Sequence, residues 1–248
     1  SCGENGMAGN DELNVLTGLK ERSIREKGCG YTLKELGVIA YHRGDLAQAR
    51  QKLEKAAEIH RQRDRYTDFL RSLNNLIGVA RAEKQYEQAL AYYQEAVPYF
   101  NVISSEFDRA MLEIAMGGTL FEMGNYQEAE AAFRRANSPY LQRSRHVYQR
   151  ALIWQCLGNT LLKQNRLDES ERCLQESASL WADASDDLML ANTLGTLGEL
   201  YAERKGMAKT AVSYLDQAIS LLIKYPDDAA AVRLQEEFLT LKDSLVKA

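Results

Sequence analysis

Histidines and one acidic run are the residues of this chain that could bind a metal ion. The three histidines are His42, His60 and His146. None of them stands in an HExxH motif or near paired cysteines. The run Asp183, Asp186 and Asp187 lacks the glycine and the distant glutamate of a calcium loop. We therefore interpret the histidines as surface residues and the run as the cap of a following helix, at Asp186 or Asp187.

Catalytic and phosphate-binding motifs are also absent from the sequence. It has no GxxxxGK[ST] motif, and its glycine-rich start follows no predicted strand. No nucleophile, base and orienting group occur together. We therefore expect no metal, no cofactor and no enzymatic activity; a hydrolase would require a polar cluster that the sequence does not display.

Amide, basic and apolar side chains instead suit the binding of another polypeptide. Amides can both donate to and accept from a peptide backbone, and arginines can take a carboxylate. The candidate residues are Lys34, Tyr41, Arg71, Asn74, Asn75, Arg81, Met111, Ile114, Phe121, Gln155, Asn159, Asn192 and Glu199. The alternative is that several of them only solvate an unused face or cap loops.

A repeated pattern supplies the elements that would position these side chains. It returns after 40, 40, 41 and 40 residues, and its centres are Gly37, Ile77, Gly117, Gly158 and Gly198. Each unit has a leucine or methionine before this position, a turn residue seven on, and an alanine or serine further along, as in LGVIAYHRGDLAQA from Leu36. The fifth unit fits only with one inserted residue, which places its turn residue at Gly206. The apolar spacing is helical and no window alternates with period two, so each unit predicts a pair of helices joined by a turn.

These units resemble tetratricopeptide repeats over residues 31 to 220. The resemblance implies an all-α fold, a right-handed α-α superhelix of about five helix-turn-helix repeats. It also implies a concave face, lined by the first helix of each repeat, that binds a protein or peptide. The 40-residue length is similar to that of Partner of Inscuteable-type adaptors and of bacterial regulator sensor domains.

The domain organisation follows from the repeats. We expect a disordered segment over residues 1–10, an N-terminal capping helix or half repeat over 11–30, five repeats over 31–225 and a C-terminal capping helix over 226–248. The half repeat is either a cap or a sign that the chain comes from something longer.

One ligand class of the family can be compared residue by residue. Members that bind the acidic tails of chaperones use a clamp of lysines, asparagines and an arginine on three successive first helices. Lys34 and Asn75 match this clamp, whereas Val38, Met111 and Ala115 do not. The resemblance therefore does not favour chaperone tails as partners.

Charge limits the classes of partner. The formal net charge is -4 and the pI is about 5.6, so we expect no nucleic-acid partner, because such binding needs a basic surface. A basic band contains Arg134, Arg135, Arg143, Arg145 and Arg150. It precedes an acidic band from Asp168 to Glu203. The two bands either neutralise each other or steer a partner of opposite pattern, including a second copy of this chain.

Cysteine use and hydropathy bear on location. No apolar stretch reaches the roughly 18 residues of a membrane span, and Cys2, Cys29, Cys156 and Cys173 show no pairing pattern. We expect a reducing cytoplasm; a lipoprotein anchored through Cys2 is the alternative.

The leading functional hypothesis is a non-catalytic protein- or peptide-binding scaffold, and the second is a regulatory sensor module of a larger signalling protein.

Overall fold

The computed structural model describes residues 30–103, 105–143 and 146–247. Within these residues it has twelve α-helices, one short 3-10 helix and no strand, so the predicted all-α class is confirmed. The chain divides into two compact units, Ser1–Met123 and Gly124–Ala248. The segments expected over 1–10 and 11–30 lie outside the described residues, except for Gly30.

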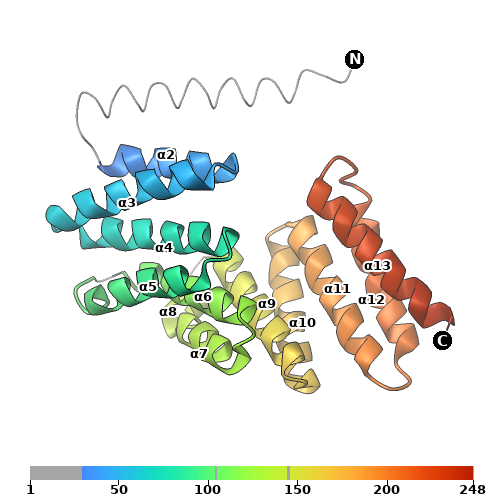
Figure 1. Ribbon diagram of the computed structural model, residues 1–248. Coiled ribbons are helices and arrows are strands. Elements are labelled where there is room, and N and C mark those ends of the chain that lie inside the picture. Colours follow the sequence, from blue (N-terminus) through green and yellow to red (C-terminus); the bar gives the residue numbers. More distant parts are fainter. Residues whose placement is uncertain (1–29, 104, 144–145, 248) are drawn as a thin grey trace, which may run out of the picture. The chain divides into compact units, whose positions relative to one another are not determined.

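Helices alternate along each unit, and neighbours joined by a short turn run antiparallel (Figure 1). The first unit contains α2 (Gly30–His42), α3 (Leu46–Gln62), α4 (Tyr66–Ala82), α5 (Tyr86–Ala96), η1 (Val97–Tyr99) and α6 (Glu106–Glu122). The second unit contains α7 (Tyr126–Ala136), α8 (Pro139–Arg143), α9 (Val147–Lys163), α10 (Leu167–Asp183), α11 (Asp187–Glu203), α12 (Ala208–Leu222) and α13 (Ala229–Lys247). We call α2, α4, α6, α9 and α11 the A helices, and α3, α5, α7, α10 and α12 the B helices.

A glycine at the centre of an A helix lets its B helix approach closely. A Cβ atom added to Gly37 would lie 2.6 Å from Leu53 Cγ, and one added to Gly158 would lie 2.6 Å from Leu174 Cγ. Both leucines are almost completely buried. Glycine lowers helix stability by about 1 kcal/mol relative to alanine, and the contact with the leucine compensates for that cost.

Small residues on the B helices complete this interface. Ala49, Ala129 and Ala211 are completely buried. In the fourth repeat serines take the alanine positions, and their hydroxyls donate to the A helix: Ser170 Oγ to Gly158 O at 2.7 Å and Ser177 Oγ to Ala151 O at 2.9 Å. These bonds satisfy the hydroxyls inside the helix pair, where an unpaired polar group would be destabilising.

The turns between A and B helices use left-handed backbone, as the turn residues of the repeat predict. Gly44, Lys84 and Asn165 have φ values of 78°, 57° and 59°. Two junctions between repeats use the same conformation at Asp64 and Ser185, with φ values of 54° and 56°; the sequence pattern did not point to them. The helix after Ser185 is capped by Asp186, whose carboxylate accepts from Met189 N at 3.0 Å.

The second unit ends in a helix that packs on the last repeat. α13 contacts both α12 and α11, and Phe238 is buried with Leu215 and Leu222 in one apolar cluster. The ring of Phe238 occupies the space that a side chain at Gly195 would need. Gly195 therefore determines how closely α13 can approach α11.

His60 was predicted to be a surface residue, and that prediction is wrong. The side chain is fully buried at the end of α3, beside Gly30. Burial lowers its pKa below the ordinary 6.5; Arg65 and Lys34 act in the same direction, and Asp68 acts against it. Helical spacing in fact indicates this burial, because His60 follows Leu53, Ala56 and Ala57 by seven, four and three residues on one face of α3. The surface assignment was based on the residue type alone.

Leucine substitutions should distinguish the packed glycine from an open one. We expect Gly158→Leu to lower the free energy of unfolding by about 3 kcal/mol, because the new side chain overlaps Leu174. Gly78→Leu is the matched control: no atom lies within 4 Å of its added Cβ, so stability should stay equal or rise by up to about 1 kcal/mol. Urea unfolding followed by circular dichroism measures both. Equal stability of the two variants would contradict this packing.

Burial of His60 predicts a pH-dependent stability. The folded state disfavours the proton, so its pKa is lowered and the unfolded chain binds the proton first. The free energy of unfolding should therefore be greatest above pH 6.5 and should fall as the pH drops below that value. His60→Leu should reduce this decline, while His42→Leu, at an exposed position, should leave it unchanged. Thermal melts between pH 5 and 8 measure the difference, and identical profiles for His60→Leu and the wild type would refute the assignment.

Candidate peptide-binding groove

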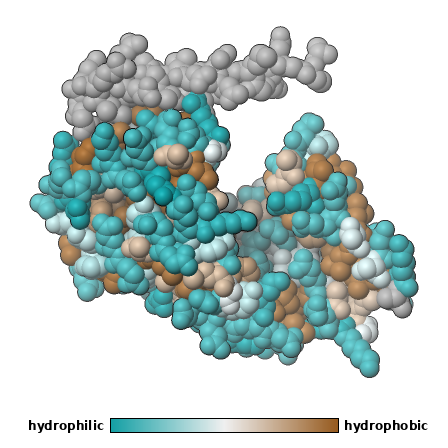
Figure 2. Space-filling model, viewed as in Figure 1, coloured by the Kyte–Doolittle hydropathy of each residue, from teal (hydrophilic) through white to brown (hydrophobic). Residues whose placement is uncertain are grey.

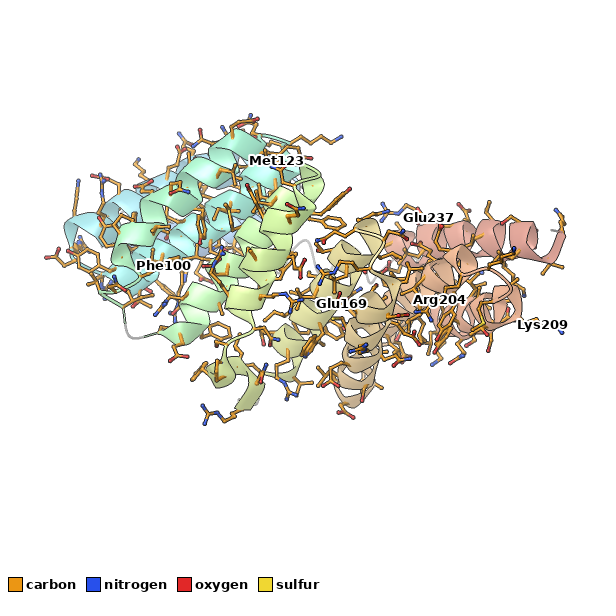
Figure 3. The ribbon with its side chains drawn as sticks, turned by 90° about the horizontal axis from the view of Figure 1, so that it is seen from below. Phe100, Met123, Glu169, Arg204, Lys209 and Glu237 are labelled. Atoms are coloured by element: carbon orange, nitrogen blue, oxygen red, sulfur yellow. The ribbon has the colours of Figure 1, made fainter. Side chains whose placement is uncertain are left out.

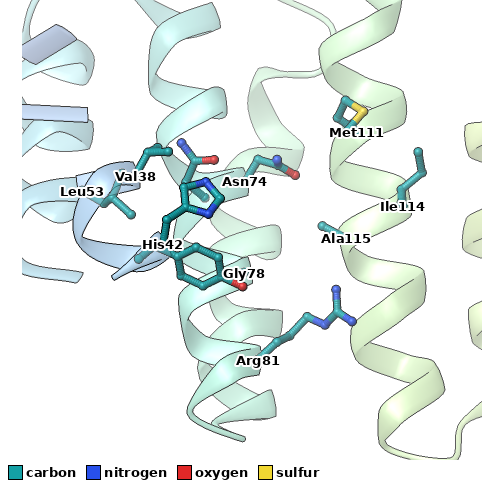
Figure 4. Close-up of a pocket in the computed structure, with 11 residues that line it drawn as sticks. Val38, His42, Leu53, Asn74, Gly78, Arg81, Met111, Ile114 and Ala115 are labelled. Carbon is teal, nitrogen blue, oxygen red and sulfur yellow. The ribbon is translucent and has the colours of Figure 1, made fainter. Parts of the chain in front are cut away.

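A groove lies along the A helices of the first unit (Figure 4). It consists of two adjoining pockets of about 320 and 260 Å³ that share Asn74, Asn75 and Met111 in their lining. The larger pocket is lined by Val38, Tyr41, His42, Leu53, Asn74, Asn75, Gly78, Arg81, Met111, Ile114 and Ala115. The smaller is lined by Lys34, Leu70, Arg71, Asn74, Asn75, Phe107, Asp108 and Met111. We call the two pockets together the A-helix groove.

Two residues that line this groove each have a buried polar atom without a hydrogen-bond partner. The atoms are Asn74 Oδ1, an acceptor, and Arg81 Nε, a donor. Both residues belong to α4 and line the larger pocket. Because buried polar groups are nearly always hydrogen-bonded, a ligand that supplied an N–H to Asn74 and an oxygen to Arg81 would complete them.

Two predicted carboxylate-binding arginines are already paired with carboxylates of α6. Arg71 donates through Nε and Nη2 to Asp108 at 2.8 and 3.1 Å, and this contact raises the pKa of Arg71. Arg81 pairs with Glu122 and lies across Gly118, where an added Cβ would be 2.8 Å from Nη1. Both pairs connect the second repeat to the third.

The other predicted residues of the first unit differ in exposure. Lys34 is largely covered, and its ammonium lies 4.8 Å from the centre of the Tyr31 ring. Tyr41 is 37% exposed. Ile114 is buried and Met111 half-buried, so each presents only part of its surface to the groove. Phe121 is half-buried near the end of α6.

The predicted residues of the second unit do not lie in a described pocket of this kind. Gln155 is buried, and its Oε1 accepts from Trp181 Nε1 at 3.1 Å, so its amide connects α9 to α10. Asn159 and Asn192 are half-buried, and Asn159 Oδ1 has no hydrogen-bond partner. Glu199 is exposed, yet desolvation by the surrounding protein raises the pKa of its carboxyl.

The basic and acidic bands neutralise each other in part within the second unit. Arg166 contacts both Glu130 and Glu169 at 2.6 Å. Arg134 contacts Glu130 at 2.7 Å. Glu169 is labelled in Figure 3, together with Arg204, which continues the network one repeat further by pairing with Asp168 and Glu171 at 2.7 Å.

The remaining members of the basic band have separate environments. Arg143 donates through Nε to Pro139 O at 3.2 Å within α8, a helix that the repeat pattern did not predict. Arg150 has a buried Nε without a hydrogen-bond partner. Arg135 interacts with another residue. Arg145 lies outside the described residues. Polar residues predominate on the visible surface of both units (Figure 2).

Sequence reasoning missed Gly78 as part of the groove. It directly follows Ile77 in the repeat, so a second small residue beside the central position was the available signal. Ala115 and His42 were missed as well, because neither residue type by itself indicates binding. These residues meet only when α2, α4 and α6 lie side by side.

No group of three or more His, Cys, Asp or Glu in the part of the chain that the structure describes could hold a metal ion. Nor is any described helix long and apolar enough to cross a membrane.

Comparison with known proteins identifies the class. The sequence matches the tetratricopeptide repeat family over residues 29–100, 68–136 and 149–224. The chain therefore belongs to the tetratricopeptide repeat family, whose members form repeat scaffolds for protein-protein interaction. No curated protein matches the sequence.

Solved structures with the same fold are distant in sequence. A Rap protein complexed with Competence and Sporulation Factor is 15% identical with a TM-score of 0.62, over 88% of this chain and 65% of that one. The apo form of RapI is 14% identical with a TM-score of 0.68, over 92% and 89%. BtubC from P. vanneervenii is 14% identical with a TM-score of 0.63, over 82% and 87%. This chain thus spans less than two thirds of the Rap structure, and likeness at these identities shows the fold alone.

The two arginines of α4 should differ in their effect on stability. Arg71→Met leaves the carboxylate of Asp108, which is 5% exposed, without its cation, and should lower the free energy of unfolding by about 1–2 kcal/mol. Arg81→Met removes a pair with the partly exposed Glu122 and should cost less than about 0.5 kcal/mol. Urea unfolding of both variants checks this, and the reverse order would refute it.

Proposed function

We propose that the A-helix groove of the first unit binds an extended peptide segment of another protein, so that the chain acts as a non-catalytic scaffold. The observation that carries this proposal is the pair of buried, unpartnered polar atoms on α4, Asn74 Oδ1 and Arg81 Nε. A peptide backbone offers both an N–H donor and a C=O acceptor at every non-proline residue. It is therefore the ligand that completes both atoms without requiring a particular sequence.

The length of the groove suits a short extended segment. Its lining residues on α4 run from Leu70 to Arg81, which corresponds to about 16 Å along a helix. An extended chain rises about 3.3 Å per residue, so about five residues of a ligand fit along it. Neighbouring apolar and amide side chains would contact the ligand's side chains.

The net charge of the groove lining is moderate because its arginines are paired with Asp108 and Glu122. This favours recognition of a backbone and of apolar side chains over recognition of a highly charged tail. Family membership supports a protein or peptide as partner, and the acidic pI of about 5.6 supports the expectation that nucleic acid is not one.

A regulatory sensor module is the second candidate function. It is favoured by the fold shared with a Rap protein that was solved with Competence and Sporulation Factor, and by the 65% of that protein which this chain covers. A sensor would change conformation when it binds its ligand, whereas a scaffold would not. Small-angle scattering of the chain with and without a bound peptide distinguishes the two: a changed radius of gyration favours the sensor.

Substitution of Asn74 tests the groove. Random heptapeptides displayed on phage are selected on the wild-type chain, and the consensus peptide is synthesised with a fluorophore for anisotropy titrations. Asn74→Ala should weaken binding of that peptide about tenfold or more, because an acceptor for the backbone is lost. Stability should not fall, since the removed oxygen has no partner in the free protein.

Asn159→Ala is the matched control, because it removes the same kind of unpartnered oxygen from α9 of the second unit. It should leave the affinity unchanged. If Asn159→Ala weakened binding and Asn74→Ala did not, the site would belong to the second unit. If no peptide were selected at all, the proposed function would be refuted.

A further inference from the structure

Gly78 differs from five other glycines that lie inside helices. A Cβ atom added at Gly37, Gly118, Gly158, Gly195 or Gly198 would lie under 3.0 Å from a neighbouring side chain. At Gly78 no such atom lies within 4 Å. Close packing therefore explains the use of glycine at those five positions, but not at Gly78.

A glycine inside a helix lowers helix stability relative to alanine. Gly78 gains nothing in return from packing within the free protein, yet it lines the larger pocket of the A-helix groove. The absence of a side chain there leaves open space in the groove. A ligand that fills this space would supply the missing contacts.

The next repeat shows what occupies the equivalent space elsewhere. Gly118 is the residue 40 positions after Gly78, and the guanidinium of Arg81 from the preceding A helix lies over it. The residue 40 positions before Arg81 is Tyr41. Tyr41 is 37% exposed and is not within 4 Å of the Cβ position of Gly78. The space over Gly78 is therefore open, whereas the equivalent space over Gly118 is filled by Arg81.

We infer that Gly78 is the floor of an anchor site that accepts one aliphatic side chain, of leucine or methionine size, from the bound peptide. The inference rests on the proposed function of the groove. Val38, Ile114 and Met111 provide apolar walls, and Figure 4 shows them on α2 and α6, on either side of the α4 segment that carries Gly78. A charged side chain would lose its hydration against these walls and is disfavoured.

Two polar residues of α4 determine which side chain of the peptide enters the anchor site. Asn74 lies one helical turn before Gly78 and Arg81 lies almost one turn after it, on the same face of α4. A backbone held by both residues would pass directly over Gly78. The side chain between the two backbone contacts is thus the one that enters the anchor site.

The experiment uses the full chain and the consensus heptapeptide selected on it. Each position of the peptide is replaced in turn by Gly, Ala, Leu, Met, Glu and Lys, and affinities are measured by anisotropy. We expect one position at which Leu or Met binds about tenfold or more tightly than Gly, Glu or Lys. Gly78→Leu should weaken binding of the consensus peptide about tenfold or more and abolish the preference at that position.

Two further variants make the result specific. Gly78→Ala should shift the preferred anchor toward a smaller residue, because it fills part of the space. Ala91→Leu, at an exposed position of α5 outside both pockets, should leave affinity and preference unchanged. Gly78→Leu should also fold as stably as the wild type, since the space it enters is open.

The outcomes distinguish a failure of the anchor-site inference from a failure of the proposed function of the groove. If Gly78→Leu kept the affinity and the preference while Asn74→Ala weakened binding, the anchor site would be refuted and the groove retained. If neither variant changed the binding of a selected peptide, the peptide would bind elsewhere and both proposals would fail. A peptide with no preferred aliphatic position would also overturn the anchor site.

Discussion

The close approach of the two helices within a repeat is the contact on which the rest of this structure depends. A leucine of the B helix lies against a glycine of the A helix at Gly37, Gly158 and Gly198. This contact determines the distance between the helices, and buried alanines and serines extend it along the pair. Since each pair is narrow at this point, successive A helices within a unit can lie side by side and expose a common face. The groove of the first unit is built on that face.

Polar contacts between repeats have a different role. Arg71 with Asp108, Arg166 with Glu130 and Arg204 with Asp168 each join residues 36 or 37 positions apart. Opposite charges that lie about one repeat apart along the sequence are therefore partners across a repeat boundary. Exposed pairs of this kind contribute little to stability individually, but they reduce the charge of the surfaces they cross. The groove of the first unit is consequently more apolar and less basic than its sequence suggests.

Glycine thus has two distinct uses in one repeat pattern. At the central position it is required by packing, and at Gly78 it is not. Asn74 and Arg81 show a similar departure, because each has a buried polar atom without a partner. Favourable local choices are the rule in folded proteins, and departures from them concentrate at functional sites. Three such departures on one face of α4 are the basis for placing the binding site there.

The sequence by itself determined the helix pairs, their turns and the family, because helical periodicity and left-handed turn residues act over a few neighbouring positions. It also pointed to half of the residues that line the groove, among them Asn74, Asn75, Arg81 and Met111, which follow from the repeat register. Only the tertiary structure decided which polar side chains remain available to bind a ligand. Gln155 bonds to Trp181, and Arg71 pairs with Asp108. These outcomes depend on helices that are distant in sequence and adjacent in space, which no local pattern records.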